Sequence, residues 1–208
     1  MKQNSSTTIF RFFRMGSLWE NPLLRGLLGL SPAVLICTGL KQGLILCVFT
    51  LCAFLPTALL TRFFLRKLPF WLRIPVYVLC SALILSPLSL LMEALFPAAM
   101  ADVELFAPVI VVNSAQFLML ETVANGNTAR RRSLPLVAGM MTGFLLVLLL
   151  LSALRELCGS GALWDIPVLG QPLFPAALSP FAALILLGLL AALLQWTRNR
   201  FHREETLE

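Results

Sequence analysis

Two long stretches without a charged side chain constrain this sequence more than any other feature. No charged residue occurs between Lys41 and Arg62, or between Arg132 and Arg155. A helix of about 20 mostly apolar residues is long enough to cross the hydrocarbon core of a bilayer. Charged residues make up only 12% of the chain, whereas about a quarter of a typical soluble domain is charged. The sequence therefore predicts an integral membrane protein.

The apolar segments predict an all-α fold with six transmembrane helices. We place the spans at residues 23–40, 44–61, 74–96, 105–123, 134–157 and 173–197. Residues 1–20 are expected to form a cytoplasmic or interfacial segment, residues 21–197 one six-helix membrane domain, and residues 198–208 a charged cytoplasmic tail. The first 20 residues are polar and aromatic, which argues against a secretory signal peptide.

The distribution of basic residues predicts the orientation of these helices. The six spans place 14 of the 16 Lys and Arg residues on one side of the membrane, and only Lys41 and Arg155 on the other. Basic residues collect on the cytoplasmic side of membrane proteins, so both termini are expected in the cytoplasm. Orientation and attraction to anionic lipid account for the net charge of +6. The charge is therefore no indication of nucleic-acid binding.

The cysteines and the single histidine do not form a recognisable site. The five cysteines are Cys37, Cys47, Cys52, Cys80 and Cys158. They lack the C-x-x-C spacing of metal and redox motifs, and His202 lies in the charged tail. We expect the cysteines to act as small apolar residues in membrane helices. The sequence thus indicates no catalytic residue and no metal site, and contains no hydrolase triad or phosphate-binding glycine loop.

Six spans divide into two halves of three, which must cross the membrane in opposite directions if they are related. This is the inverted repeat of many transport proteins. The first span carries Ser31 and Pro32, and the fourth carries Pro108, Asn113 and Ser114. Proline removes a backbone donor and clashes with the preceding turn, so we expect a 3+3 inverted repeat with interrupted first and fourth helices. Either these breaks line a central site, or the prolines bend the helices and the Ser and Asn side chains bond to nearby carbonyls.

Several segments resemble a known family. They read NPLLRGLLGLSP at 21–32, RIPVYVL at 73–79, LFAPVIVVNSA at 105–115 and LPLVAGMMTGFLLVLLLLSALRELCGSG at 134–161. From residue 20 to 197 the chain resembles the E-type membrane subunit of the Rnf electron transport complex. The D-type subunit of the sodium-pumping NADH:quinone reductase is similar.

The resemblance implies a location, a partner and a cofactor. It implies a six-helix protein of the bacterial cytoplasmic membrane, paired with a homologous subunit of opposite orientation within a larger Rnf-type complex. In such a pair, cysteines on the half-helices of the first and fourth spans hold one [2Fe–2S] cluster near the middle of the membrane. Electrons cross the membrane through this cluster, and their transfer is coupled to transport of sodium ions or protons.

The family's cluster-ligand positions fall on Ser31 and Ser114 in this sequence. Iron–sulfur clusters are held by thiolates, and a serine hydroxyl is a harder, less acidic ligand. We therefore expect a divergent, non-catalytic membrane subunit of an ion-translocating electron transport complex, without a cluster of its own. Three alternatives stay open: ligands supplied by the partner, a stand-alone inverted-repeat transporter or channel, and a structural or assembly partner without a redox role.

Two further motifs have a packing interpretation. Arg155 and Glu156 are adjacent on a helix and do not face each other, so Arg155 is expected to extend toward the membrane surface. Gly139 and Gly143 have the G-x-x-x-G spacing that allows close contact between helices.

Overall fold

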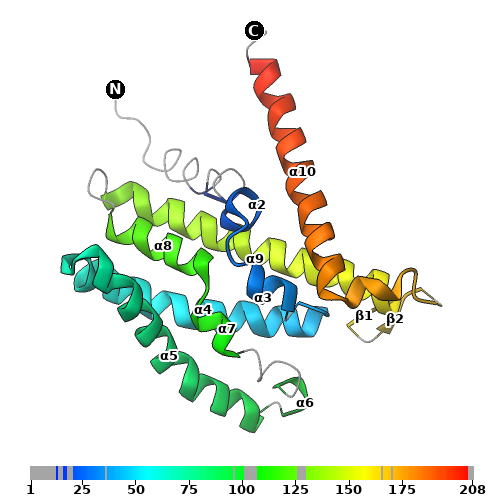
Figure 1. The fold of residues 1–208 in the computed structure, drawn as a ribbon, viewed down its shortest axis with the longest axis horizontal. Helices are drawn as coiled ribbons and strands as arrows, with labels where there is room; N and C mark the ends of the chain where they lie inside the picture. Colours follow the sequence, from blue (N-terminus) through cyan, green and yellow to red (C-terminus); the bar gives the residue numbers. More distant parts are fainter. Residues whose placement is uncertain are drawn as a thin grey trace.

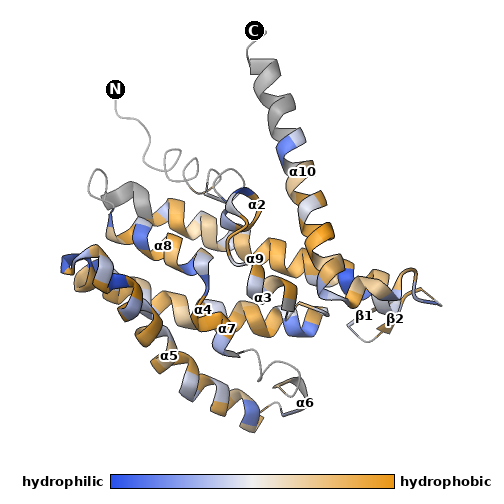
Figure 2. Cartoon of the chain, in the orientation of Figure 1, coloured by the Kyte–Doolittle hydropathy of each residue, from blue (hydrophilic) through white to orange (hydrophobic). Residues whose placement is uncertain are grey.

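The structure, a computed structural model, describes residues 13, 16–17, 21–35, 37–95, 97–100, 107–125, 130–164, 166–169 and 171–205. Three of its helices are long and apolar enough to cross a membrane: α4 (Leu40–Phe63), α5 (Phe70–Leu95) and α9 (Arg130–Ser160). In Figure 2 hydrophobic colours run along all three. The prediction of a largely helical membrane protein is therefore confirmed.

The segments expected to hold the first and fourth spans each contain two short helices. The first comprises α2 (Pro22–Gly26) and α3 (Leu30–Leu35), and the second comprises α7 (Ala107–Val111) and α8 (Ser114–Ala124). Helix α3 contacts α7, and α2 contacts α8, so the two interrupted segments lie side by side (Figure 1).

The remaining elements connect or follow these helices. A one-turn 3-10 helix, η2 (Leu65–Lys67), joins α4 to α5, and α6 (Pro97–Met100) follows α5. After α9, strands β1 (Ala162–Leu163) and β2 (Ile166–Pro167) pair antiparallel. The last helix, α10 (Pro180–Glu205), follows the 3-10 helix η4 (Pro175–Leu178) and projects away from the other helices in Figure 1.

Helix α10 begins later than the span predicted at 173–197. Pro175 stands at the start of η4, and the backbone of Ser179 is extended, which separates η4 from α10. The Ser179 hydroxyl accepts from the Ala182 N–H. The local turn chemistry at Ser179 and Pro180 thus fixes the helix start, a detail that average hydropathy does not record.

The hydrophobic core lies where α4, α8 and α9 contact one another. Phe49 of α4, Leu120 of α8, and Phe144 and Leu148 of α9 are fully buried there. Helices α5 and α10 instead expose many large apolar side chains, such as Leu83 and Leu189. In a protein that lies in a bilayer, such surfaces face lipid or other protein chains rather than water.

The G-x-x-x-G glycines lie where another part of the chain approaches α9 closely. A Cβ atom on Gly139 would collide with the backbone carbonyl oxygen of Phe13, and one on Gly143 would collide with that of Ser17. Gly16 in turn lies against the carbonyl oxygen of Leu136. Glycine is required here because any side chain would push the two backbones apart.

Substitution Gly143→Val should therefore destabilise the protein. Forcing a side chain into a filled contact typically costs about 1–3 kcal/mol, so the midpoint of thermal unfolding in detergent should fall. Gly188→Val is the matched control, because a Cβ atom on Gly188 of α10 would meet nothing within 4 Å. Equal midpoints for the two variants would contradict the close contact.

Candidate functional site

The interruption between α2 and α3 spans Leu27 to Gly29. Leu27 and Gly29 both have a left-handed backbone, with φ of 51° and 79°. A Cβ atom on Gly29 would lie 2.7 Å from the Phe144 ring and 3.0 Å from Asn113 Oδ1. Both the backbone conformation and the close approach therefore require glycine at position 29.

The interruption between α7 and α8 lies at Val112 and Asn113. Asn113 is fully buried and caps α8, its Oδ1 accepting from the Ala115 N–H at 3.0 Å. An asparagine at this position satisfies a donor that the helix start would otherwise leave unpaired. The second break is thus stabilised by the polar side chain at the break itself.

A hydrogen bond joins the two breaks. The backbone N–H of Gly29 donates to Ser114 Oγ at 2.9 Å, linking positions 85 residues apart in the sequence. Ser31 follows Gly29 by two residues and lies in the first turn of α3, next to this bond. Both serines are exposed on the surface of this chain. The site therefore has a face that another protein chain or lipid can contact.

The prolines do not lie at the breaks. Pro32 is buried in the first turn of α3, after the break, and Pro108 is exposed in the first turn of α7, before the break. The expectation that each helix is interrupted at its proline therefore differs from the structure. Proline is tolerated in the first helical turn because the N–H that it lacks has no partner within the helix there.

A polar seam, which we define as Arg73, Tyr77, Ser81, Gln116 and Glu121, joins α5 to α8. Arg73 forms an ion pair of 3.3 Å with Glu121, which also accepts from the Tyr77 hydroxyl at 3.0 Å. One helical turn after Tyr77 on α5, Ser81 Oγ accepts from Gln116 Nε2 at 2.8 Å. The partners on α5 recur every fourth residue, so they lie on one face of that helix.

Two buried polar atoms near the breaks have no hydrogen-bond partner among the described residues. They are Asn113 Nδ2 and Gln116 Oε1. The sequence interpretation included Asn113 but missed the polar seam. Signals for it were present, because Tyr77 is the single tyrosine of the chain and Glu121 is the single charged residue in the span predicted at 105–123. Ionisable residues inside membrane segments are commonly functional.

Arg155 holds the far end of α3 in place. Its side chain has no exposed surface and donates to the carbonyl oxygens of Val34 at 3.1 Å and Cys37 at 2.7 Å. It also donates to three carbonyl oxygens at the end of η4, at 2.7 to 3.2 Å. These belong to Ala177, Leu178 and Ser179. The expectation that Arg155 extends toward the membrane surface is wrong, because the carbonyl oxygens at the ends of α3 and η4 accept hydrogen bonds from its guanidinium group, which has five donors.

Glu156 has the opposite role at the start of α4. Its Oε2 accepts from the Leu40 N–H at 2.7 Å, next to Gly39, which has no side chain to cap the helix. A cation thus meets the carbonyl end of one helix, and an anion meets the N–H end of the next. Each charge complements the local helix dipole. Two adjacent residues of α9 therefore fix the connection between α3 and α4.

Taken together, the fold and the site define a helical membrane protein in which two interrupted segments meet at a hydrogen bond. The chain belongs to the Rnf-Nqr subunit family of membrane proteins, whose model matches residues 9–191.

Relatives of this chain are named as E subunits of ion-translocating oxidoreductase complexes. The chain is 30% identical to the E-type subunit of the Na(+)-translocating ferredoxin:NAD(+) oxidoreductase complex of Acetobacterium woodii, covering 89% of this chain and 95% of the relative. It is 28% identical to the proton-translocating counterpart of Clostridium ljungdahlii, covering 90% and 88%. The E-type subunit of the ion-translocating oxidoreductase complex of Haemophilus ducreyi is 31% identical, covering 76% and 70%.

Substitution Ser114→Ala tests the bond between the breaks. It leaves the Gly29 N–H without its acceptor, a loss that costs about 1–3 kcal/mol. We expect faster hydrogen exchange of backbone amides around Gly29 and a lower midpoint of thermal unfolding. Ser31→Ala, at an exposed position, is the control. Unchanged amide exchange in Ser114→Ala would show that the bond does not hold the breaks together.

Substitution Arg155→Lys tests the clamp on α3 and η4. A lysine has three donors for five carbonyls, and each unsatisfied buried carbonyl costs about 1–3 kcal/mol. We expect lower thermal stability and faster labelling of the buried Cys37 by maleimide. Arg66→Lys, on an exposed side chain, should change neither. A stable Arg155→Lys variant with a protected Cys37 would rule out the clamp.

Proposed function

We propose that this chain is the E-type membrane subunit of an Rnf-type electron transport complex that couples electron transfer to sodium or proton translocation. Family membership and the names of its relatives support the assignment. Within that complex we propose a divergent subunit that holds no [2Fe–2S] ligands of its own. The presence of serine at both of the positions where the family resemblance places cluster ligands, Ser31 and Ser114, is the observation that carries this proposal.

The side chains near the two helix breaks do not fit the ligands that a [2Fe–2S] cluster needs. Ser114 Oγ already accepts the Gly29 N–H, and hydroxyl groups are poor substitutes for the thiolates that hold iron–sulfur clusters. Cys37 lies six residues beyond Ser31, buried against the Arg155 clamp. Among the described residues, no three His, Cys, Asp or Glu side chains gather as a metal-binding group.

In this proposal the six spans form a 3+3 inverted repeat with both termini in the cytoplasm of a bacterium. Each half would consist of an interrupted segment followed by two helices, namely α4 and α5 in the first half and α9 and α10 in the second. The distribution of basic residues supports the orientation. The exposed faces of Ser31 and Ser114 would contact a homologous subunit of opposite orientation. The chain's own part is to hold that interface in shape.

A second candidate function is a stand-alone inverted-repeat transporter or channel. The polar seam favours it, because Arg73 and Glu121 continue into buried Ser81 and Gln116 close to the interrupted helices. Interrupted helices that meet polar side chains are typical of transport sites. Purification of the tagged chain from its native membrane separates the two, since only the first function requires stable co-purification with other members of the complex.

Iron and acid-labile sulfide measured on the chain, purified with its partner subunit, test the proposal directly. We expect no iron bound in a stoichiometric amount at the interface between the two subunits. A stoichiometric [2Fe–2S] signal in electron paramagnetic resonance would overturn the absence of a cluster. The double substitution Ser31→Cys and Ser114→Cys should allow a cluster to form. Ser86→Cys with Ser89→Cys, on α5, is the control pair and should not.

A further inference from the structure

The turn between α4 and α5 lies at the surface of the membrane. Helix α4 has 24 residues and α5 has 26, so the two helices measure about 36 and about 39 Å at a rise of about 1.5 Å per residue. The hydrocarbon core of a bilayer is about 30 Å thick. Only residues 64–69 connect the two helices, so this short connection lies in the layer of lipid headgroups.

Arg73 holds this turn in a fixed shape. Its Nε donates to the carbonyl oxygen of Leu68 at 2.9 Å, and its Nη2 donates to the carbonyl oxygen of Arg66 at 3.2 Å. The third guanidinium nitrogen, Nη1, forms the ion pair with Glu121, so the charge of Arg73 is balanced within the chain. Arg73 thus orders the backbone of the turn without adding net charge to its surface.

Arg66 and Lys67, by contrast, carry charges that no acidic side chain in the described part of the protein balances. Both residues are exposed in η2. The two long helices that η2 contacts are α4, which contains no acidic residue, and α5, whose single acidic residue, Glu93, lies at the opposite end. The carboxylate on α8, Glu121, is already paired with Arg73. The turn therefore presents two positive charges to the layer in which the phosphates of lipids lie.

Exposed aromatic side chains flank these two charges on both sides in the sequence. Phe63 and Phe64 precede them and are 58% and 67% exposed, and Phe70 and Trp71 follow them and are 62% and 72% exposed. Aromatic rings are enriched where lipid headgroups meet acyl chains. The position of these rings at the ends of two membrane-length helices favours lipid over an acidic soluble protein as the occupant of the turn.

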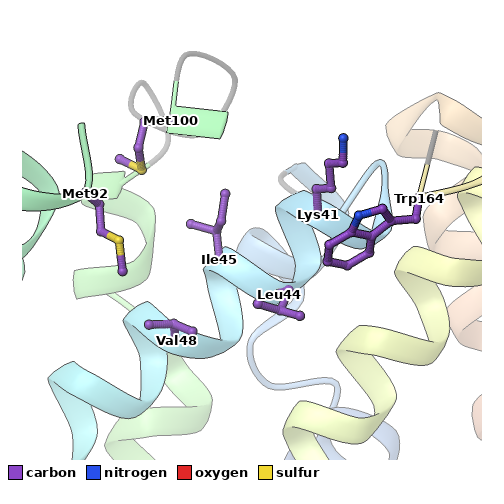
Figure 3. A pocket seen from close by; sticks show the side chains of 7 residues that line it. All are labelled: Lys41, Leu44, Ile45, Val48, Met92, Met100 and Trp164. Atoms are coloured by element: carbon purple, nitrogen blue, oxygen red, sulfur yellow. The ribbon is translucent and has the colours of Figure 1, made fainter. Parts of the chain in front are cut away.

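The groove near the other end of α4 offers no such selection for charge. It encloses about 290 Å³, and the surface that its residues turn toward it is apolar. The residues that line it, shown in Figure 3, are Lys41, Leu44, Ile45, Val48, Met92, Met100 and Trp164. The turn between α4 and α5 is therefore the surface on which unbalanced charge and apolar rings occur together.

We propose that this turn binds an anionic phospholipid, with the phosphate held by Arg66 and Lys67 and the upper part of the acyl chains against Phe64 and Trp71. Each basic side chain near a membrane surface strengthens the attraction of anionic lipid about fivefold, so two give a preference of about 25-fold over a zwitterionic lipid. Because Arg73 already orders the turn, little of this preference is lost to ordering the backbone on binding. The site does not depend on a cluster at the two helix breaks.

Fluorescence quenching at Trp71 tests the proposal in a full-length chain whose other tryptophans are replaced by Phe. The chain is placed in phosphatidylcholine vesicles with a minor fraction of phosphatidylglycerol, and one of the two lipids carries brominated acyl chains. We expect phosphatidylglycerol to be enriched beside Trp71 about 25-fold over its share of the bilayer. Arg66→Gln and Lys67→Gln should each lower the enrichment about fivefold. Lys41→Gln, at the opposite end of α4, is the matched control and should leave it unchanged. Quenching in proportion to the bulk composition would overturn the proposal, as would an equal fall in the Lys41→Gln control.

A second measurement identifies the occupant in native membranes and needs no replacement of tryptophan. A photoreactive phenylalanine analogue in place of Phe64 should cross-link to lipid on illumination, and mass spectrometry of the product should show mainly anionic phospholipid. The same analogue in place of Leu83, an exposed residue in the middle of α5, is the control and should capture lipids in proportion to their abundance. Mainly zwitterionic lipid at position 64 would overturn the proposal. Cross-linking of position 64 to another protein chain would identify a protein as the occupant and would overturn it too.

Discussion

The fold depends on a rule of the membrane interior, where every backbone N–H and C=O group needs a partner from the protein itself. A helix satisfies the rule along its length, but an interrupted helix does not. This chain interrupts two helices, and side chains at the breaks and on α9 supply partners for the backbone groups at the helix ends. The Gly29 N–H donates to the Ser114 hydroxyl, and the Ala115 N–H at the start of α8 donates to Asn113 Oδ1. Arg155 donates to the carbonyl oxygens at the end of α3.

Much of the membrane fold could be predicted from the sequence, because length and apolar content carry a strong signal. The spans placed at 44–61, 74–96 and 134–157 correspond to α4, α5 and α9 within a few residues. The interruptions were harder to place. Proline marks a region where a helix is weakened, but the left-handed backbone at Leu27 and Gly29 and the cap at Asn113 decide where the chain turns.

The site was predictable in its residues but not in its contacts. Ser31, Asn113 and Ser114 stood out as polar side chains in apolar segments. The partner of Ser114 is a backbone amide 85 residues away, and the partners of Arg155 are backbone carbonyls. Every residue except proline offers an amide donor and every residue a carbonyl acceptor, so no residue type marks them in a sequence. The role of Arg155 emerged only from the arrangement of α3, α9 and η4.

The clamp at Arg155 also sets an order in which the protein can be completed during synthesis. Chains emerge from the ribosome starting at the N-terminus, and α3 emerges more than 110 residues before the arginine that pairs with its carbonyls. Its other end is joined to a serine that also comes later. The first interrupted segment therefore reaches its final shape only after most of the chain has entered the membrane. A segment that is made before most of the other helices is thus among the last to be fixed.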